Sequence, residues 1–394
     1  MIPLALLPAT AAARTPDVAF RFVSIPDLFN ADLGDVRRMA GWDPGDPNSI
    51  NRSYRRAIDT VLDAVDREDP LFVAVAGDLV EGHWGEDADG TGIFGPVGTE
   101  EERLAAIRRA GHLYYGQWQR RFERRGLLTY PAVGDHEIGD DLGGRPLWDR
   151  WPAGTFRHRA VPTYKAVWAE NFTWPNGAPR FTLRPLGTQW ESTAYAVYPT
   201  PDMLLVTLDV FRYDASGVQP TVTEGQLAWL DALLADAEGR GVENVIVQGH
   251  VPVLGPVRSL HSGRLSLLDG GRSALWRTLK AHDVDMYMCG EVHAVTAIVD
   301  DGLLQVCHGG LIAYGGINYM LATVYENGRV DLEVKRFKRT SIDRERRLWQ
   351  TSLKRQNGAV RYKRRPRRVA GGRYGGAGGF RRVTGMFRPY APPH

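Results

Sequence analysis

The sequence predicts an α/β fold in which two mixed β-sheets pack face to face with flanking helices. Short apolar runs of strand length recur from residue 19 to residue 335. In the first half of the chain these runs alternate with segments of helical periodicity, in the β-α-β-α-β order of a layered α/β domain. In the second half strands predominate and only two helices are expected. Two such halves indicate two sheets packed against each other, with the helices outside.

The elements of the first half follow from the spacing of their apolar side chains. Apolar residues of 54–65 share one face of a helix, whereas 71–76 is a continuous apolar run of strand length. We expect, in order, a strand at 19–25, a helix at 54–65, a strand at 71–76, a helix at 101–124 and a strand at 127–133.

The second half is expected to be mostly antiparallel. Its helix at 223–237 begins with Thr223 and Gln226, which have the spacing of a capping box. The expected elements are strands at 194–198 and 204–209, helices at 223–237 and 271–282, and strands at 244–248, 285–289, 294–299, 303–307, 319–325 and 329–335.

These elements place one domain at residues 19–340, with an insertion at 139–192. The insertion is rich in Trp, Arg, Pro and Gly, and its aromatic side chains either line a substrate cleft or form a small core under a long loop. Residues 1–18 are interpreted as a lead segment or the remnant of a signal peptide. Residues 341–394 form a basic, Gly/Arg-rich tail that is expected to be disordered.

The net charge of +3 hides a division between this tail and the rest of the chain. Residues 351–394 contain twelve Lys or Arg and no Asp or Glu, so the first 350 residues carry a net charge of −9. A basic tail on an acidic body can contact a polyanion such as a nucleic acid, an anionic lipid or a wall polymer. The alternative is a solvated extension without a fixed partner.

Two features bear on the compartment. No run approaches the roughly 20 apolar residues that cross a membrane, so no transmembrane segment is predicted. A short apolar stretch before Ala11-Ala12-Ala13 fits a signal-peptidase site and favours export to the periplasm or beyond, with the cytoplasm as the alternative.

The two cysteines, Cys289 and Cys307, lie in apolar runs, so buried free thiols are expected and a disulfide between neighbouring strands is the alternative.

Polar clusters follow five of the expected strands. Carboxylates and imidazoles are costly to gather unless a cation lies among them, and strand ends of an α/β sheet are where ligands usually bind. This pattern predicts a site for two metal ions that hydrolyses a phosphate ester. The clusters are Asp27, Asp78, Asp135-His136-Glu137, His250, and Glu291 with His293.

The order of these clusters resembles that of the calcineurin-like metallophosphoesterases. The usual blocks of that family are D-x-H, G-D, G-N-H-[DE], a lone H and G-H-x-H. Here the blocks read Asp27-Leu28-Phe29, Gly77-Asp78, Gly134-Asp135-His136-Glu137, Gly249-His250 and Gly290-Glu291-Val292-His293. The resemblance covers residues 19–335 and implies the two-sheet fold described above.

The resemblance also implies roles for the individual residues. His136 would face the substrate phosphate and act as general acid, without binding metal. Glu137 would orient His136 or a neighbouring loop. The implied ligands are Asp27 and His293 for the first ion, Asp78 as the bridge between both ions, and Asp135, His250 and Glu291 for the second ion.

Three positions depart from the family pattern. Phe29 stands where a metal-binding His is usual, Asp135 where Asn is usual, and Glu291 where His is usual. The resemblance makes Glu81 a candidate to replace the missing His, because the purple acid phosphatase branch carries a tyrosine ligand at that position, and Asn30 is a weaker candidate.

The altered ligands bear on the metals and on the function. Added carboxylates favour Mn²⁺, iron, Mg²⁺ or Ca²⁺ over Zn²⁺. They also predict either a trivalent iron at one site or a preference for singly charged phosphodiesters. The leading hypothesis is a phosphomonoesterase or phosphodiesterase that uses a dinuclear centre and metal-bound hydroxide. The alternative is a catalytically impaired relative that binds a polyanion.

Two further polar residues follow strands and are expected to have structural roles. His308 is expected to be a hydrogen-bonded core residue, although it could lie near the site. Asp209 is expected to support the fold. His83 lies close to Asp78 in sequence but belongs to no block.

Overall fold

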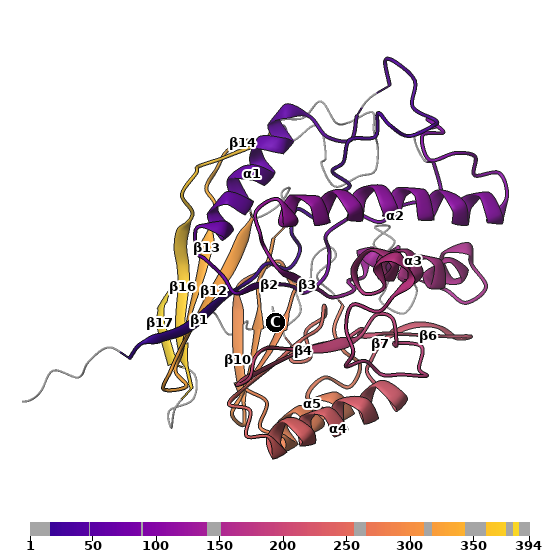
Figure 1. Cartoon of the computed structure of the whole chain (residues 1–394). Coiled ribbons are helices and arrows are strands. Elements are labelled where there is room, and N and C mark those ends of the chain that lie inside the picture. The colour runs from indigo at the N-terminus through magenta and orange to yellow at the C-terminus, as the bar shows by residue number, and fades with distance from the viewer. Residues whose placement is uncertain are drawn as a thin grey trace, which may run out of the picture.

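A computed structural model describes residues 16–46, 48–87, 90–139, 151–255, 265–310, 317–342, 360–375 and 381–385. In these residues two large mixed sheets, of seven and six strands, stack with helices on both outer sides (Figure 1). The predicted fold class is therefore confirmed. Residues 1–15, which hold the proposed signal-peptidase site, lie outside the described part of the chain.

The first sheet has the strand order β17-β16-β13-β12-β1-β2-β3. Its β1, β2 and β3 run parallel to one another, and β12 pairs antiparallel with β1. Every side chain of β2 is buried, as expected for a central parallel strand covered on both faces. Its strands are β1 (Val18–Ser24), β2 (Phe72–Val75), β3 (Thr129–Pro131), β12 (Asn318–Tyr325), β13 (Val330–Arg336), β16 (Arg367–Tyr374) and β17 (Arg381–Gly385).

The second sheet has the order β10-β11-β9-β8-β5-β4. Its centre is parallel, because β11, β9, β8 and β5 pair with one another in the same direction. The prediction of a mostly antiparallel second half is therefore wrong for the middle of this sheet. Its strands are β4 (Tyr195–Thr200), β5 (Met203–Thr207), β8 (Asn244–Gln248), β9 (Met286–Cys289), β10 (Thr296–Asp300) and β11 (Leu303–Cys307). Two small hairpins complete the strands, β6 (Phe211–Asp214) with β7 (Gly217–Pro220), and β14 (Arg339–Ile342) with β15 (Val360–Tyr362).

The helices cover the stacked sheets from opposite sides. The helices α1 and α2 lie on one side, and α4 and α5 lie on the other (Figure 1). None of the helices in the described ranges is long and apolar enough to span a membrane. Their bounds are α1 (Arg52–Asp66), α2 (Glu100–Glu123), α3 (Phe156–Phe172), α4 (Glu224–Gly239) and α5 (Ala274–Ala281).

The start of α4 differs from the predicted capping box. Thr223 is the N-cap, but its side chain makes no capping hydrogen bond. The Gln226 side chain instead bonds both backbone groups of Asp209, accepting from its N–H at 3.0 Å and donating to its carbonyl at 2.8 Å. The spacing of Thr223 and Gln226 assigned the Gln226 side chain to the N-terminus of α4, but in the structure this side chain binds the buried loop that follows β5.

The segment interpreted as an insertion contributes to the main core. Its described part contains α3, which packs beside α2. Trp151, Tyr164, Trp168 and Phe172 are buried in the hydrophobic core, which favours packing over the lining of a cleft. Buried side chains occur on nearly all sides of α3, so the sequence shows no amphipathic stripe there. Residues 140–150, including Trp148, lie outside the described residues.

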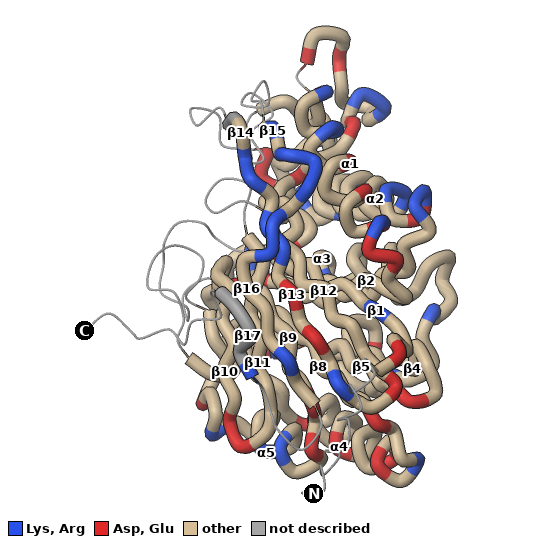
Figure 2. Tube along the Cα trace, turned by 90° about the vertical axis from the view of Figure 1, so that its left-hand side faces the viewer, with Lys and Arg blue, Asp and Glu red and all other residues tan. Residues whose placement is uncertain are grey.

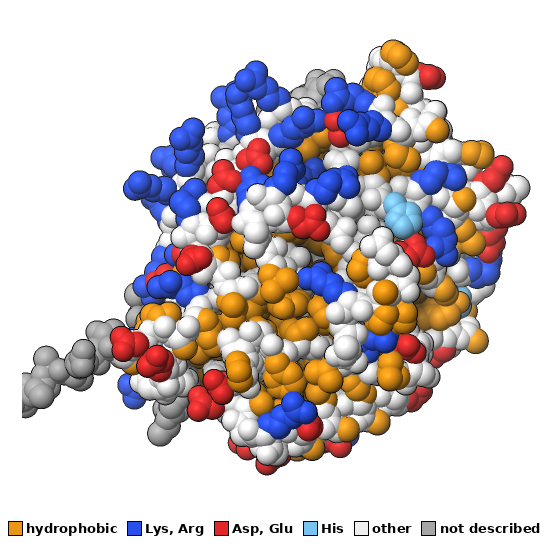
Figure 3. All heavy atoms as spheres, viewed as in Figure 1, with side chains coloured by type: hydrophobic (Ala, Val, Ile, Leu, Met, Phe, Trp, Pro, Cys, Tyr) orange, Lys and Arg blue, Asp and Glu red, His pale blue; other side chains and the backbone are white. Residues whose placement is uncertain are grey.

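The prediction of a disordered tail is wrong for the described part of residues 341–394. There β16 extends the first sheet beside β13, β17 follows at its edge, and β15 pairs with β14. Exposed Arg361 lies between buried Val360 and Tyr362, and exposed Arg373 lies between buried Gly372 and Tyr374, a pattern that the Gly/Arg-rich composition obscured. The exposed Lys and Arg gather near β14, β15 and β16 at one end of the molecule (Figures 2 and 3).

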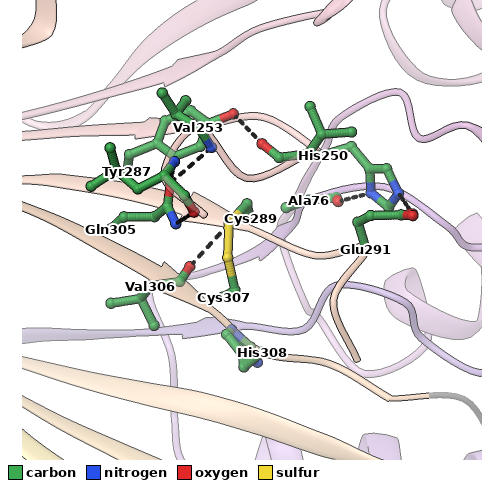
Figure 4. The surroundings of a disulfide bond; sticks show 12 residues. Ala76, His250, Val253, Tyr287, Cys289, Glu291, Gln305, Val306, Cys307 and His308 are labelled. Atoms are coloured by element: carbon green, nitrogen blue, oxygen red, sulfur yellow. Dashed lines mark hydrogen bonds and ion pairs between the residues drawn. A yellow bond between two sulfur atoms is a disulfide. The ribbon is translucent and has the colours of Figure 1, made fainter. Parts of the chain in front are cut away.

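The expectation of free thiols is also wrong. Cys289 of β9 and Cys307 of β11 form a disulfide with their Cα atoms 4.8 Å apart (Figure 4). The two residues lie directly opposite each other in the parallel pair, an adjacency that sequence spacing does not reveal. Structural disulfides are typical of oxidising compartments. The bond therefore fits the expected export, which stays a prediction.

Reduction of this disulfide should destabilise the protein. The bond spans 18 residues, and opening a loop of that size typically lowers the free energy of unfolding by about 3 kcal/mol. Urea unfolding with and without reductant measures the change. A Cys289→Ser/Cys307→Ser variant serves as the control, because reductant should leave it unaffected. Two titratable thiols in denatured, unreduced protein would contradict the disulfide.

Candidate metal centre

Six of the side chains predicted to bind metal converge at one end of the stacked sheets. They follow the carboxyl ends of β1, β2, β3, β8 and β9. Their ligand atoms form two groups, and within each group all atoms lie within 4.8 Å of one another. Asp78 belongs to both groups. The first group is Asp27, Asp78 and His293, and the second is Asp78, Asp135, His250 and Glu291.

In the second group, His250 is oriented with one ring nitrogen toward three carboxylates. Its Nδ1 lies 2.7 Å from the carbonyl oxygen of Ala76, so this nitrogen carries the proton (Figure 4). Its Nε2 lies 2.9 Å from Asp135 and 3.4 Å from both Asp78 and Glu291. A backbone bond at one nitrogen that leaves the other free is the usual arrangement of a metal-binding histidine.

The first group is less shielded from solvent, because His293 is only partly buried, whereas every member of the second group is buried. Asp27 is fully buried, and its Oδ1 lies 3.2 Å from Nε2 of His293. The same oxygen accepts a hydrogen bond of 3.2 Å from the backbone of Glu291, which ties the two groups together. The other oxygen of Asp27 is buried and accepts no hydrogen bond. An unsatisfied buried carboxylate oxygen is what a cation would satisfy.

The pKa values reflect the crowding of acidic groups. Burial raises the pKa of Asp78 well above its usual range, and Asp135 raises it further against the opposing effect of His250. Burial by itself would lower the pKa of His250, but the surrounding carboxylates raise it well above its usual range. The cluster therefore needs positive charge, which either protons or metal ions can supply. The donor set of carboxylate oxygens and imidazole nitrogens suits a hard or intermediate metal cation.

Uncommon backbone conformations place these ligands. Asp27, Asp78, Glu291 and His293 all have φ between 51° and 62°, in the left-handed region that residues other than glycine rarely adopt. Such strain persists where the surroundings impose it, and it clusters at functional sites. A Cβ atom at Gly134 would collide with the carboxylate of Asp78, so glycine is required there.

Glu137 holds the loop that carries Asp78. Its buried carboxylate accepts hydrogen bonds from the backbone N–H groups of Asp78 at 2.7 Å, Leu79 at 2.9 Å and Gly134 at 2.7 Å. Glu137 belongs to neither metal group. The structure thus agrees with the expectation that Glu137 orients a loop.

His136 is fixed by a network that the sequence did not indicate. Its Nδ1 lies 2.8 Å from the carbonyl oxygen of Glu81, and its Nε2 lies 4.0 Å from Asp78. Asp32 holds this loop, because its carboxylate accepts from the N–H of Glu81 at 3.0 Å and from the indole of Trp84 at 2.9 Å. Asp32 belongs to no recognisable block, so only its burial beside the loop identifies it.

The positions around the missing histidine have three different outcomes. Phe29 is buried and contacts the rings of Trp118 and Tyr362, so it serves the core. Glu81 is in neither group of ligand atoms within the described ranges, and the hypothesis that it replaces the missing ligand gains no support. Asn30 donates a hydrogen bond of 3.3 Å to Asp78, while its buried Oδ1 makes no hydrogen bond. Asn30 is therefore the better placed of the two candidates.

The residues expected to be structural lie outside both groups. His308 bonds Asn318 and Ser24 in the core, and burial lowers its pKa to about 4. Asp209 accepts a hydrogen bond from Thr193 and forms a buried ion pair of 2.6 Å with Lys165 of α3. His83 is likewise in neither group.

Comparison with known proteins identifies the family. A model of the calcineurin-like phosphoesterases matches residues 28–295, which is more than half of the chain. The chain therefore belongs to this family. No curated protein sequence matches it significantly.

Solved structures show a likeness at low sequence identity. PhoD has a TM-score of 0.51 and 12% identity, over 95% of this chain and 73% of PhoD; this likeness supports the fold. The purple acid phosphatase PPD1 from yellow lupin (Lupinus luteus) has a TM-score of 0.49 and 14% identity, over 80% of this chain and 51% of PPD1. The chain thus spans about half of the lupin protein. A putative 5'-nucleotidase from Staphylococcus aureus has a TM-score of 0.41 and 12% identity, over 87% of this chain and 52% of that protein.

Asp32 should make stability depend on pH. Burial raises its pKa from 3.8 to about 6, so the stability that its protonated form contributes is present below pH 4 and is lost as the pH rises through 6. Relative to Asp32→Asn, the wild type should lose up to about 3 kcal/mol of unfolding free energy between pH 4 and pH 7. Urea unfolding of chelator-treated protein at each pH measures this difference.

The control for this prediction is Asp66→Asn, which changes an exposed carboxylate of α1. A constant difference between wild type and Asp32→Asn across the pH range would contradict the assignment.

Proposed function

We propose that the protein is a metal-dependent hydrolase of phosphate esters with a dinuclear centre. The observation that carries this proposal is the pair of ligand groups that share Asp78. A carboxylate shared by two cations would offset their mutual repulsion. Membership of the calcineurin-like phosphoesterase family supports the same reading. Two bound cations would supply an activated water and neutralise the phosphate oxygens.

The chain's own residues would bind these cations and handle the proton of the leaving group. Asp27 and His293 would hold one ion, Asp135, His250 and Glu291 the other, and Asp78 both. The bond from Nδ1 of His136 to the Glu81 carbonyl leaves Nε2 free on the side of Asp78. This nitrogen can carry a proton to the departing alkoxide. Asp32 and Glu137 would act as positioning residues.

The ligand set favours metals that accept oxygen ligands. Four carboxylates and two imidazoles suit Mn²⁺ or iron, with Mg²⁺ and Ca²⁺ as further candidates, better than Zn²⁺. A trivalent iron at one position would offset the additional negative charge from Asp135 and Glu291. The alternative is a substrate with one negative charge, such as a phosphodiester, which the acidic centre would repel less than a phosphomonoester dianion.

A second candidate function is binding of a polyanion without catalysis. Phe29, which replaces a metal-binding histidine of the family and packs in the core, favours it. Six candidate ligands in two groups, five of them buried and His293 partly buried, favour the hydrolase instead.

Metal content should depend on the individual ligands. Wild-type protein purified without chelators should contain two ions per chain. Asp78→Ala should retain neither, because it removes a ligand from both groups, and His293→Ala should retain one. Elemental analysis after gel filtration measures the ratio, with the surface variant His112→Ala as the control. Two ions retained in Asp78→Ala would contradict a shared ligand.

If His136 is the general acid, the loss of activity on replacing it should depend on the leaving group of the ester. His136→Ala should lower kcat by about 10²–10⁴-fold for esters with alkoxide leaving groups, which need a proton. The loss should be smaller for a nitrophenyl ester, because nitrophenolate departs without one. Assays with added Mn²⁺ measure both rates, and equal losses would remove His136 from the acid role. If wild type and Asp78→Ala are equally inert with every metal and ester, the binding function replaces the hydrolase.

A further inference from the structure

A groove lined by arginines lies between α1 and β15 and shares no residue with the candidate metal centre. Its volume is about 1010 Å³. Two segments separated by about 300 residues supply five exposed arginines, which we call the arginine groove: Arg52, Arg56 and Arg67 from α1 and its end, and Arg361 and Arg364 from β15 and the turn that follows.

The walls of this groove are held together. Ser53 of α1 bonds both backbone groups of Val360, donating to its carbonyl at 2.8 Å and accepting from its N–H at 3.0 Å. Tyr362 is buried beneath the groove, with its ring 6.0 Å from that of Phe337 and 6.5 Å from that of Phe29. The arginines of β15 are therefore held beside α1 by specific contacts.

Carboxylates near the groove offset the charge of its arginines only in part. The two that line it, Asp59 and Asp63, are both bound by Arg125 of the loop after α2, at 2.8 and 2.7 Å. Within the described residues, none of the five groove arginines forms an ion pair with a carboxylate. Elsewhere in the same C-terminal segment, Arg368 pairs with Glu333 and Arg373 with Asp331.

In the described part of the chain, the groove therefore concentrates an excess of positive charge on a protein whose first 350 residues are acidic. Gathering like charges is unfavourable in isolation, and an anion in the groove would relieve the repulsion. Figure 3 shows Lys and Arg side chains gathered on the part of the surface where α1 and β14 lie.

The shape and chemistry of the groove indicate the kind of anion. Guanidinium groups bind phosphate oxygens through paired hydrogen bonds. Among the described residues of its lining, Tyr362 is the one aromatic residue and is 9% exposed, so these residues offer no platform on which nucleic-acid bases could stack. A concave channel fits one extended chain better than the flat surface of a membrane.

We propose that the arginine groove binds a linear chain of phosphate groups of the inorganic polyphosphate type, through the phosphates alone. This site is separate from the proposed metal centre and does not depend on hydrolysis. Its test is a binding measurement, so failure of the proposed enzymatic function would leave it unaffected.

The experiment measures binding of a short inorganic polyphosphate of defined length to the full chain, by calorimetry at several salt concentrations. Arg361→Glu/Arg364→Glu should abolish measurable binding at physiological salt. Arg361→Ala/Arg364→Ala should lower the slope of log affinity against log salt by about two, because two phosphate contacts are lost. Arg56→Glu alters the opposite wall and should also weaken binding, so the test does not depend on the folding of β15 variants.

Lys363→Glu/Arg365→Glu is the matched control. It makes the same change in net charge in the same turn, but these residues do not line the groove, so most of the affinity should remain. Equal loss of affinity in both double variants would indicate general electrostatic attraction to the basic segment and would contradict binding in the groove. Absence of binding to wild type would also overturn it.

Two further ligands test the chemical class. Tighter binding of a single-stranded oligonucleotide with the same number of phosphates would show that bases contribute and would overturn recognition by phosphates alone. Groove-dependent binding to vesicles of anionic lipid that exceeds binding to polyphosphate would overturn the choice of a linear chain.

Discussion

The constraint on which this structure depends is the burial of four carboxylates in one place. Asp27, Asp78, Asp135 and Glu291 are each at most 1% exposed, and two histidines are the nearest groups able to carry positive charge. Without compensating cations, such a cluster is strongly unfavourable in the interior. The fold maintains it because the ends of parallel strands from both sheets meet at this position, and each loop is held by contacts outside the cluster.

Those outer contacts explain how the ligands remain in place. Glu137 and Asp32 hold successive parts of the loop after β2 by accepting backbone hydrogen bonds. Backbone conformations that are rare for residues other than glycine aim the ligands inward. Neither Glu137 nor Asp32 belongs to a group of candidate metal ligands. Glu137 nevertheless holds the backbone of Asp78, and Asp32 holds the loop that contacts His136. Substitutions outside the ligand set can therefore alter the centre as much as loss of a ligand.

The C-terminal segment is linked to the centre through Phe29. This residue lies two positions after Asp27, where the family usually has a metal-binding histidine, and its ring contacts Tyr362 of β15. The family usually has a metal ligand at this position, whereas in this chain the side chain packs against the C-terminal segment. Tyr374 of β16 lies 3.4 Å from Asp285 at the start of β9, which links the same segment to the second sheet. The described part of the basic segment is thus paired into the first sheet, and its charge is presented on a fixed surface.

Local sequence alone predicted most strands of the two large sheets, the helices α1, α2, α4 and α5, and the polar residues that follow the strands, but not α3, β6, β7 or β14 to β17. Apolar runs and helical spacing are local properties, so most element positions and all six converging ligands were predictable from residues close in sequence. The ordered blocks from Asp27 to His293 also identified the family. Asn30 was recognised only as a weak candidate, because its contact with Asp78 depends on the turn of the loop.

Only the tertiary structure decided which elements become neighbours. The Cys289–Cys307 bond requires β9 and β11 to be adjacent and in register, and β16 requires the free edge of β13. The role of Asp32 arises from a loop 49 residues further along the chain. The arginine groove likewise joins α1 to a segment about 300 residues away. Contacts between distant segments depend on strand order and register, which local periodicity does not encode.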